Sequence, residues 1–197
     1  MKLDISNLQS TLYFFAPFII VCYFLLFSII NADLKGIVYL IGLFCSTVLT
    51  VFIGNGIVNR NNPVVTTDSL KPHRFCNLIT INSIANVSHV PISISIYCFT
   101  AFYLLYTMIV TKYAGSNITA LVMFALLIVG DSLWLKNNNC FTGGNIFVAG
   151  VISSLLGAGW GYIIDQSNDK SIQYFTSNTN TCTMPKKRSF KCNKKTE

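Results

Sequence analysis

Five long apolar segments constrain the fold of this sequence more than any other feature. They cover residues 11–30, 36–58, 90–110, 117–135 and 144–164. Each is close to the ~20 residues that an α-helix needs to cross a bilayer, and each is apolar on all sides, as a membrane-embedded helix is. Strands of a transmembrane barrel would instead alternate polar and apolar residues in units of ~10. The pattern therefore predicts an all-α, polytopic membrane bundle with five transmembrane helices.

The composition agrees with a membrane protein and excludes an ordinary soluble domain. Charged residues make up 11% of the chain and hydrophobic residues 52%, whereas about a quarter of a soluble domain is charged. The first apolar segment lacks a small-residue cleavage site, so we expect it to be retained rather than removed as a signal peptide. We predict a helical bundle over residues 1–164 and a soluble basic tail over residues 165–197.

The longest connection between spans covers residues 59–89 and is polar. Within it, residues 75–87 could form an interfacial helix. Five spans place this connection and the tail on opposite sides of the membrane. The side of the connection carries five Lys and Arg residues and the side of the tail carries nine. The positive-inside bias therefore favours a cytoplasmic tail.

Ionisable residues are almost absent from the spans. Asp131 lies near the end of the fourth span, where we expect an interfacial carboxylate capped by water or by Ser132. A carboxylate inside the membrane would instead point to function, because hydrocarbon disfavours charge. His89, just before the third span, is interpreted as an interfacial imidazole. No His, Cys and acidic residues cluster at metal-ligand spacing, so neither a metal nor a cofactor is expected.

Small residues recur along one stripe of the fifth segment and predict close helix packing. They are Gly150, Ser154, Gly157 and Gly161. The Gly-x-x-x-Gly pair lets a second backbone approach closely, and we favour packing within the bundle over dimerisation. Trp160 and Tyr162 are expected at the far membrane interface, where such rings collect.

Cys182 and Cys192 flank a basic segment of the tail. They could form a disulfide that closes a small basic loop, or remain free thiols in a reducing compartment. Two ligands are too few for a zinc site. The basic segment suits anionic lipid or an acidic protein, with nucleic acid as a weaker candidate, unless it is only a solvated tail.

The last helix resembles part of a known family of membrane enzymes. The segment "NIFVAGVISSLLGAGWGYII" follows the cadence of the helix after the third motif of the type 2 phosphatidic acid phosphatase superfamily. That family carries the motifs K-x6-R-P, P-S-G-H and S-R-x5-H-x3-D near one membrane face. The resemblance spans residues 54–164 and implies a helical-bundle membrane enzyme fold.

At the motif positions, this chain lacks the residue types that carry the family's chemistry. The first motif would fall on Asn55, Asn62 and Pro63, the second on Pro91 and Ile94, and the third on Ser132, Leu133, Asn139 and Gly143. Asparagines stand where the family has its lysine, an arginine and the nucleophilic histidine. Isoleucine, leucine and glycine stand where it has a second histidine, a second arginine and an aspartate. The chain therefore resembles a degenerate member of the superfamily.

These replacements bear on catalysis. In the family, as the resemblance implies, cationic side chains hold the phosphate, one histidine attacks phosphorus and the other protonates the leaving group. Losing all members of such a unit leaves no catalytic route. We therefore expect a non-catalytic membrane protein on a phosphatase-like scaffold.

Two alternatives remain open, so whether the protein is an enzyme is not decided by the sequence. One is an active lipid phosphatase with relocated catalytic residues, for which Arg60, His73, Arg74 and His89 are candidates. The other is a small channel or transporter, which the shortage of polar residues within the spans disfavours.

A second resemblance concerns the source of the chain. The tail pattern "IQYFTSNTNTCTMPKKRSFKC" after such a bundle resembles membrane proteins encoded by large nucleocytoplasmic DNA viruses. The resemblance implies a viral membrane or virion structural component, in a host endomembrane or in the internal membrane of the virion. It also implies membrane lipids as partners, with a capsid or core protein as the partner of the tail.

Overall fold

The computed structural model describes residues 5–31, 33–61, 80–81, 85–86, 88–112, 117–167, 182–183 and 191–192, with side chains at 11–31, 33–57, 88–112 and 117–167. Its helices are α1 (Ile5–Ile30), α2 (Lys35–Asn61), α3 (Ile92–Val110), α4 (Ile118–Asn137) and α5 (Gly143–Gln166). All five are long and apolar enough to cross a membrane. The prediction of an all-α, polytopic membrane bundle is therefore confirmed, while a soluble tail over residues 165–197 stays a prediction.

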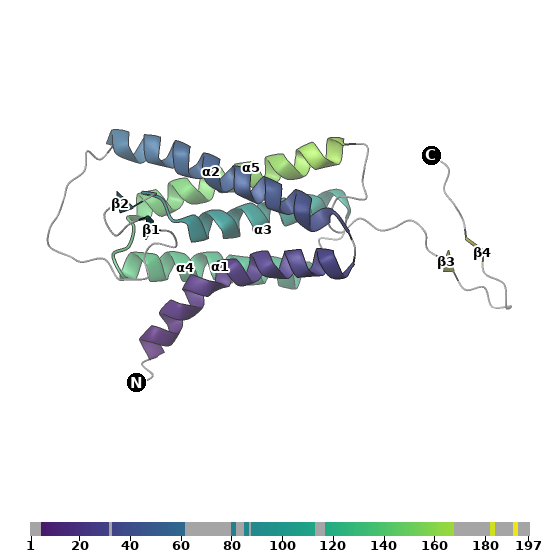
Figure 1. The fold of residues 1–197 in the computed structure, drawn as a ribbon, viewed down its shortest axis with the longest axis horizontal. Coiled ribbons are helices and arrows are strands. Elements are labelled where there is room, and N and C mark those ends of the chain that lie inside the picture. Colours follow the sequence, from purple (N-terminus) through teal and green to yellow (C-terminus); the bar gives the residue numbers. More distant parts are fainter. Residues whose placement is uncertain are drawn as a thin grey trace.

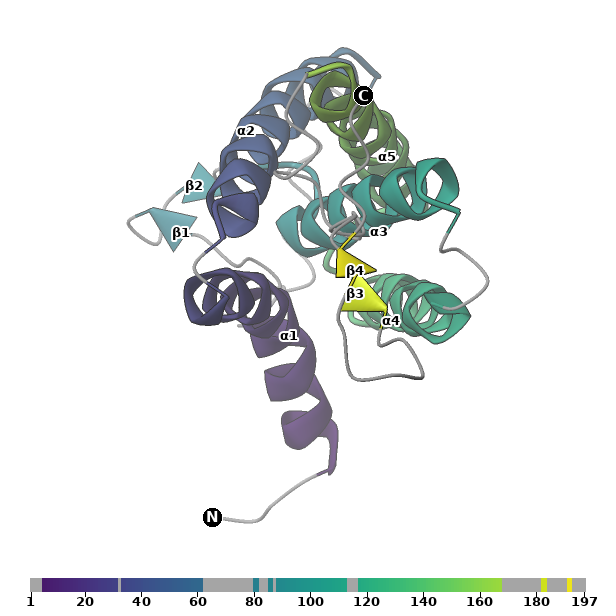
Figure 2. The same ribbon diagram turned by 90° about the vertical axis from the view of Figure 1, so that its right-hand side faces the viewer.

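Helix α3 is the central element of the bundle. Buried residues make up 72% of its span, against 17% to 33% of the other four spans. It packs against every other helix and most extensively against α5. Figure 2 shows α3 between α5 and α4, with α1 and α2 beside it. The outer helices expose large apolar side chains such as Phe44, Phe52 and Leu126, as helices that face lipid do.

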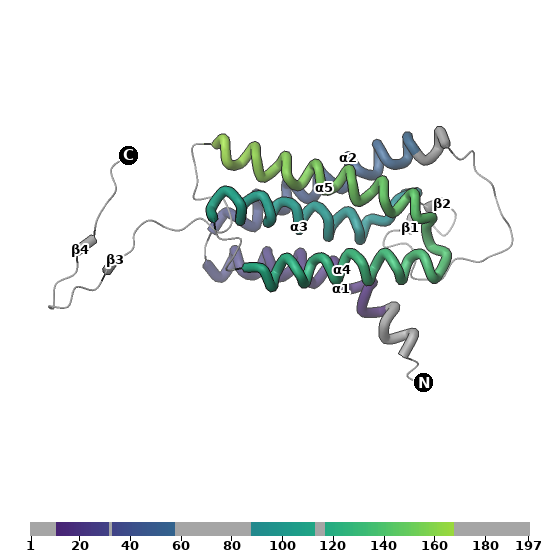
Figure 3. The backbone as a smooth tube through the Cα atoms, turned by 180° about the vertical axis from the view of Figure 1, so that it is seen from behind, coloured from purple at the N-terminus to yellow at the C-terminus, as the bar shows by residue number. Residues whose placement is uncertain are grey.

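The connections alternate between the two ends of the bundle (Figures 1 and 3). One end holds the end of α2, the start of α3 and the connection from α4 to α5. We call it the motif end, because Asn55, Pro91, Asn139 and Gly143 belong to it. The other end holds the connections from α1 to α2 and from α3 to α4.

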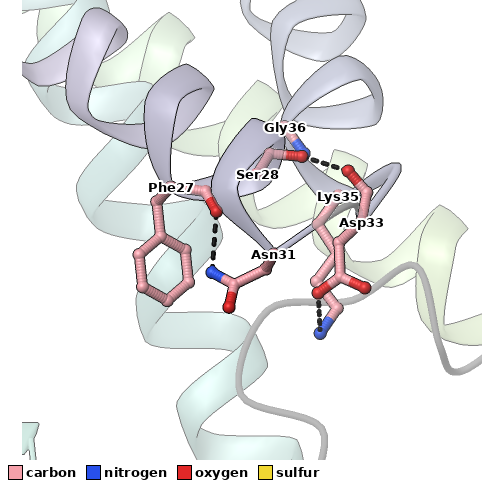
Figure 4. Close-up of polar contacts among 6 residues, drawn as sticks. All are labelled: Phe27, Ser28, Asn31, Asp33, Lys35 and Gly36. Carbon is pink, nitrogen blue, oxygen red and sulfur yellow. Dashed lines mark hydrogen bonds and ion pairs between the residues drawn. The ribbon is translucent and has the colours of Figure 1, made fainter.

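The turn from α1 to α2 is fixed by short polar contacts (Figure 4). The Ser28 hydroxyl donates to the Asp33 carbonyl and accepts from the Gly36 backbone N–H at 2.9 Å. A Cβ at Gly36 would lie 2.5 Å from the Ser28 Cβ, so only glycine allows this approach. Lys35 forms an ion pair with Asp33 at 3.3 Å. These contacts hold α1 and α2 side by side.

An aromatic cluster fills the core between α1, α2 and α3. The Tyr39 ring centroid lies 5.0 Å from that of Phe24, 6.1 Å from Phe99 and 6.0 Å from Tyr103. The Tyr39 hydroxyl is within hydrogen-bond distance of the Thr100 hydroxyl, at 2.7 Å. Because a buried hydroxyl without a partner is costly, this bond lets tyrosine occupy the core.

Hydroxyl groups also join α2, α3 and α5 deeper in the bundle. The Ser153 Oγ lies 3.0 Å from the Thr50 Oγ1 and 2.7 Å from the Ser95 Oγ. All three side chains are buried. Hydrogen bonds of this kind hold transmembrane helices together where the hydrophobic effect gives little driving force.

The interfacial helix expected within residues 75–87 is not what the structure shows. Its described residues form two short antiparallel strands, β1 (Thr80–Ile81) and β2 (Ala85–Asn86). Residues 75–79, 82–84 and 87 lie outside the described residues. The physical reason for the first strand lies in the composition, because β-branched Thr and Ile favour extended backbone.

Candidate functional site

Two asparagine side chains clamp one backbone segment at the motif end. The Asn55 Oδ1 accepts from the His89 backbone N–H at 2.8 Å. The Asn145 Nδ2 donates to the His89 carbonyl at 3.0 Å. These bonds tie the end of α2 and the start of α5 to the segment that leads into α3. The first motif position thus lies beside the segment that leads into α3, but Asn55 binds backbone there. Asn62 and Pro63 lie outside the described residues.

The second motif position lies in the apolar core. Pro91 is buried and occupies the N-cap position of α3 with φ of −70°, which its ring favours. Ile94, where the family has a histidine, is 1% exposed. It packs in a buried cluster with Cys98, Trp134 and Leu135. This position can contribute apolar contact only.

The third motif begins on α4, where its first two residues face different surroundings. The Ser132 Oγ donates to the Ile128 carbonyl one turn earlier, at 2.6 Å. Leu133, where the family has an arginine, is 55% exposed. In a spanning helix such a side chain faces lipid.

Asn139, where the family has its nucleophile, lies directly after the C-cap residue of α4. Its φ is 52°, in the left-handed region, which asparagine tolerates better than most residues. The Asn139 N–H donates to the Lys136 carbonyl at 3.1 Å and the Cys140 N–H donates to the Leu135 carbonyl at 2.9 Å. This pair of bonds is a Schellman motif, which satisfies the last carbonyls of a helix. The asparagine is therefore a helix-terminating residue.

Three motif positions line a single groove. Ile94, Ser132 and Gly143 lie along a cavity of about 550 Å³ between α3, α4 and α5. The other lining residues are aliphatic or aromatic, apart from Cys98, Gly150 and Ser154. None of the lining residues is acidic, basic or histidine. The groove offers neither a cationic clamp for phosphate nor an imidazole nucleophile.

Asp131 is placed differently from the interfacial carboxylate that was expected. It is 2% exposed, and its Oδ2 accepts from the Ser93 Oγ on α3 at 2.6 Å. Ser132 does not cap it, because that hydroxyl bonds the helix backbone. The expectation of a capped interfacial residue is wrong, since packing of α4 against α3 covers this face. Sequence reasoning missed Ser93, and the only signal was an acidic residue within a span.

The remaining candidates divide between described and undescribed parts of the chain. His89 is exposed, and its backbone makes the contacts described above. Arg60, His73 and Arg74 have no described side chains, so a relocated catalytic set stays untested. Within the described residues, no group of three or more His, Cys, Asp and Glu could hold a metal.

The cysteines fall into distinct groups. Cys140 is disulfide-bonded, whereas Cys22, Cys45 and Cys98 are free thiols. In the tail, β3 (Cys182–Thr183) pairs antiparallel with β4 (Lys191–Cys192), and Cys182 stands directly opposite Cys192. This register favours the disulfide interpretation, and the bond itself stays a prediction.

The small-residue stripe of α5 divides between two roles. A Cβ at Gly157 would lie 2.4 Å from the Phe99 carbonyl oxygen, and one at Gly161 would lie 2.8 Å from the Tyr106 ring. These two glycines therefore allow α5 to approach α3 closely. Gly150 and Ser154 line the groove instead.

Trp160 also differs from its expected place at the membrane interface. It is half-buried, and its indole ring packs so closely on α2 that a Cβ at Gly42 would lie 2.3 Å from the ring nitrogen. Tyr162 is exposed, as expected of an interfacial ring. The expectation for Trp160 fails because Gly42 opens a space for the indole between α2 and α5.

Comparisons with protein-family models, curated proteins and solved structures found no match. The resemblance to type 2 phosphatidic acid phosphatases therefore stays a prediction from the motif positions.

Proposed function

We propose that the protein is a non-catalytic integral membrane protein built on a phosphatidic acid phosphatase-like scaffold. The observation that carries the proposal is the groove at the motif end, whose lining includes Ile94, Ser132 and Gly143 and no acidic, basic or histidine residue. Transfer of a phosphoryl group needs a nucleophile and fixed positive charge around the phosphate oxygens. Neither lies on the groove.

The motif residues with described side chains support this proposal through what they do instead. Asn55 binds the backbone of His89, Ile94 fills the core, and Asn139 terminates α4 directly after its C-cap residue. Each of these is a structural role, and none of them holds a phosphate. Such residues are expected at the motif positions of a scaffold that retains its helix packing and has lost its catalytic side chains.

The transporter alternative has one observation in its favour. Asp131 is buried within α4, and intramembrane carboxylates often belong to ion pathways. However, its Oδ2 is hydrogen-bonded to Ser93 between two packed helices. That contact fits a bond that joins helices better than a site that exchanges ions.

We also propose that the protein belongs to a viral membrane, in a host endomembrane or in the virion. The resemblance of the tail to proteins of large nucleocytoplasmic DNA viruses supports this location. The basic segment that ends in "KKRSFKCNKKTE" would contact anionic lipid or a capsid or core protein. Capture of such a protein by the wild-type tail, and its loss when the segment's lysines become glutamine, would test the contact.

Phosphate release from phosphatidic acid vesicles tests the absence of catalysis. We expect purified protein to release no more phosphate than protein-free vesicles do. His89→Ala and Arg74→Ala serve as paired variants, because these residues are candidates for a relocated site. Turnover by the wild type that either substitution abolishes would overturn the proposal and show a rebuilt active site.

A further inference from the structure

The groove has the length of one lipid leaflet. On α5 its lining begins at Gly143 and extends to Leu155, which is ~18 Å at a rise of ~1.5 Å per residue. The hydrocarbon core of a bilayer is ~30 Å thick, so one leaflet contributes ~15 Å. The groove therefore runs from the membrane surface at the motif end to about the middle of the bilayer.

The groove opens sideways toward the lipid. Ile94 and Cys98 on α3 form its buried floor, at 1% and 5% exposure. Phe147 and Leu155 on α5 form an exposed rim, at 72% and 69%. Helices α4 and α5 each pack on α3 and have almost no contact with each other, so they stand apart as walls (Figure 2). A membrane lipid can enter without leaving the bilayer.

A positive charge follows the α4 lining of the groove by one helical turn. Ile128 and Ser132 line the α4 wall, and Lys136 follows at the same spacing of four residues, which continues that face of the helix. Lys136 is exposed and forms no ion pair among the described side chains. Across the mouth, Gly143 and Gly144 begin α5, and a Cβ on either would meet nothing within 4 Å. The mouth is thus open and favours an anion.

We propose that the groove binds one acyl chain of an anionic phospholipid, whose headgroup lies at Lys136 and the start of α5. An acyl chain fits the length of the groove, its sideways opening and its apolar lining. The exposed lysine at the surface end fits a phosphate. This inference goes beyond the absence of catalysis, because binding of intact lipid is measured separately from phosphate release.

A variant that fills the groove tests whether the groove binds an acyl chain. A Cβ at Gly150 would lie 3.7 Å from the Cys98 Sγ and 3.9 Å from Ile94, which are ordinary contacts, so Gly150→Leu should place its side chain in the groove. Gly159→Leu is the matched control on the same helix, because a Cβ there meets nothing within 4 Å and Gly159 does not line the groove. Both variants add the same side chain to α5.

The measurement is native mass spectrometry of delipidated protein titrated with phosphatidylglycerol, and separately with phosphatidylcholine of the same chains. We expect the wild type and Gly159→Leu to hold one phosphatidylglycerol, and Gly150→Leu to bind it at least about tenfold more weakly. Lys136→Ala, a surface change, should remove the preference for phosphatidylglycerol while retaining chain binding.

Three outcomes would overturn the proposal. The first is equal lipid binding by Gly150→Leu and Gly159→Leu. The second is a wild type with no preference between the two lipids, or one that Lys136→Ala leaves unchanged. The third is a wild-type dimer that Gly150→Leu dissociates, which would show that a second copy fills the groove. If Gly150→Leu does not fold, Lys136→Ala still tests whether the preference for phosphatidylglycerol over phosphatidylcholine depends on this lysine.

Discussion

Replacing Gly157 with leucine should weaken the contact between α5 and α3 more than any other single change on that stripe. A Cβ at this position would lie 2.4 Å from the Phe99 carbonyl oxygen and 3.0 Å from its Cα. Both are backbone atoms, so no side-chain rotation relieves the overlap. Carbon and oxygen atoms in close contact lie ~3.3–3.6 Å apart, so the two helices must separate by about 1 Å.

Separating the two helices would also disturb the buried hydroxyl hydrogen bonds one turn away. Ser153 and Ser95 lie four residues before Gly157 and Phe99 on their helices, and their hydroxyls are 2.7 Å apart. A shift of about 1 Å would stretch this buried hydrogen bond beyond normal length. Overpacking alone costs about 1–3 kcal/mol, and the strained hydrogen bond adds up to ~1.7 kcal/mol. We expect a loss of about 2–4 kcal/mol.

Gly159→Leu is the control that separates the cost of packing against α3 from other effects of a leucine on α5. It sits two residues along the same helix, where a Cβ meets nothing within 4 Å. Both substitutions gain the same helix propensity, so their difference reports contact with α3. At ~2–4 °C per kcal/mol for a chain of this size, thermal unfolding in detergent should place Gly157→Leu about 5–15 °C below Gly159→Leu. Equal melting temperatures would refute the reasoning and show that this face of α5 looks at lipid.

Three further changes test other parts of the fold by the same thermal unfolding measurement. Ser93→Ala removes the hydrogen bond to the buried Asp131 and should cost about 1–2 kcal/mol; a stability equal to that of Ser132→Ala would contradict an interhelical role. Asn139→Val should cost about 1–2 kcal/mol because a β-branched residue disfavours the left-handed backbone, while Asn139→Gly should be tolerated; equal effects would argue against the helix-terminating role. A reductant should lower the stability of the wild type by about 2–4 kcal/mol through the Cys140 disulfide, and should lower that of Cys140→Ser by less; a loss of the same size in both proteins would show that the effect does not come from the Cys140 bond.

The spans could be predicted from the sequence because hydropathy over about twenty residues is a local property. Each predicted segment matches the apolar span of one helix to within two residues at its start, from residues 11–30 on α1 to residues 144–164 on α5. The shorter segment between α2 and α3 has no comparable hydropathy signal. Residues 75–87 mix apolar and polar residues without a clear period, so strand propensity at Thr80 and Ile81 could not be weighed against a helix.

The candidate site depended on contacts between helices, which no single segment encodes. Asn55 and Asn145 became clamps only because the end of α2 and the start of α5 lie beside His89. The partner of Asp131 lies 38 residues away on α3. The interior place of Trp160 required knowing that Gly42 faces it. The roles of the residues at the motif positions depend on this packing.

We expect the motif end to hold a phospholipid without cleaving its phosphate. Native mass spectrometry of the wild type incubated with phosphatidic acid tests both halves at once, because hydrolysis converts the bound lipid to diacylglycerol. We expect one phosphatidic acid bound per protein, with its mass unchanged over hours of incubation and no phosphate released. Progressive replacement of that bound species by diacylglycerol, abolished by His89→Ala, would contradict it.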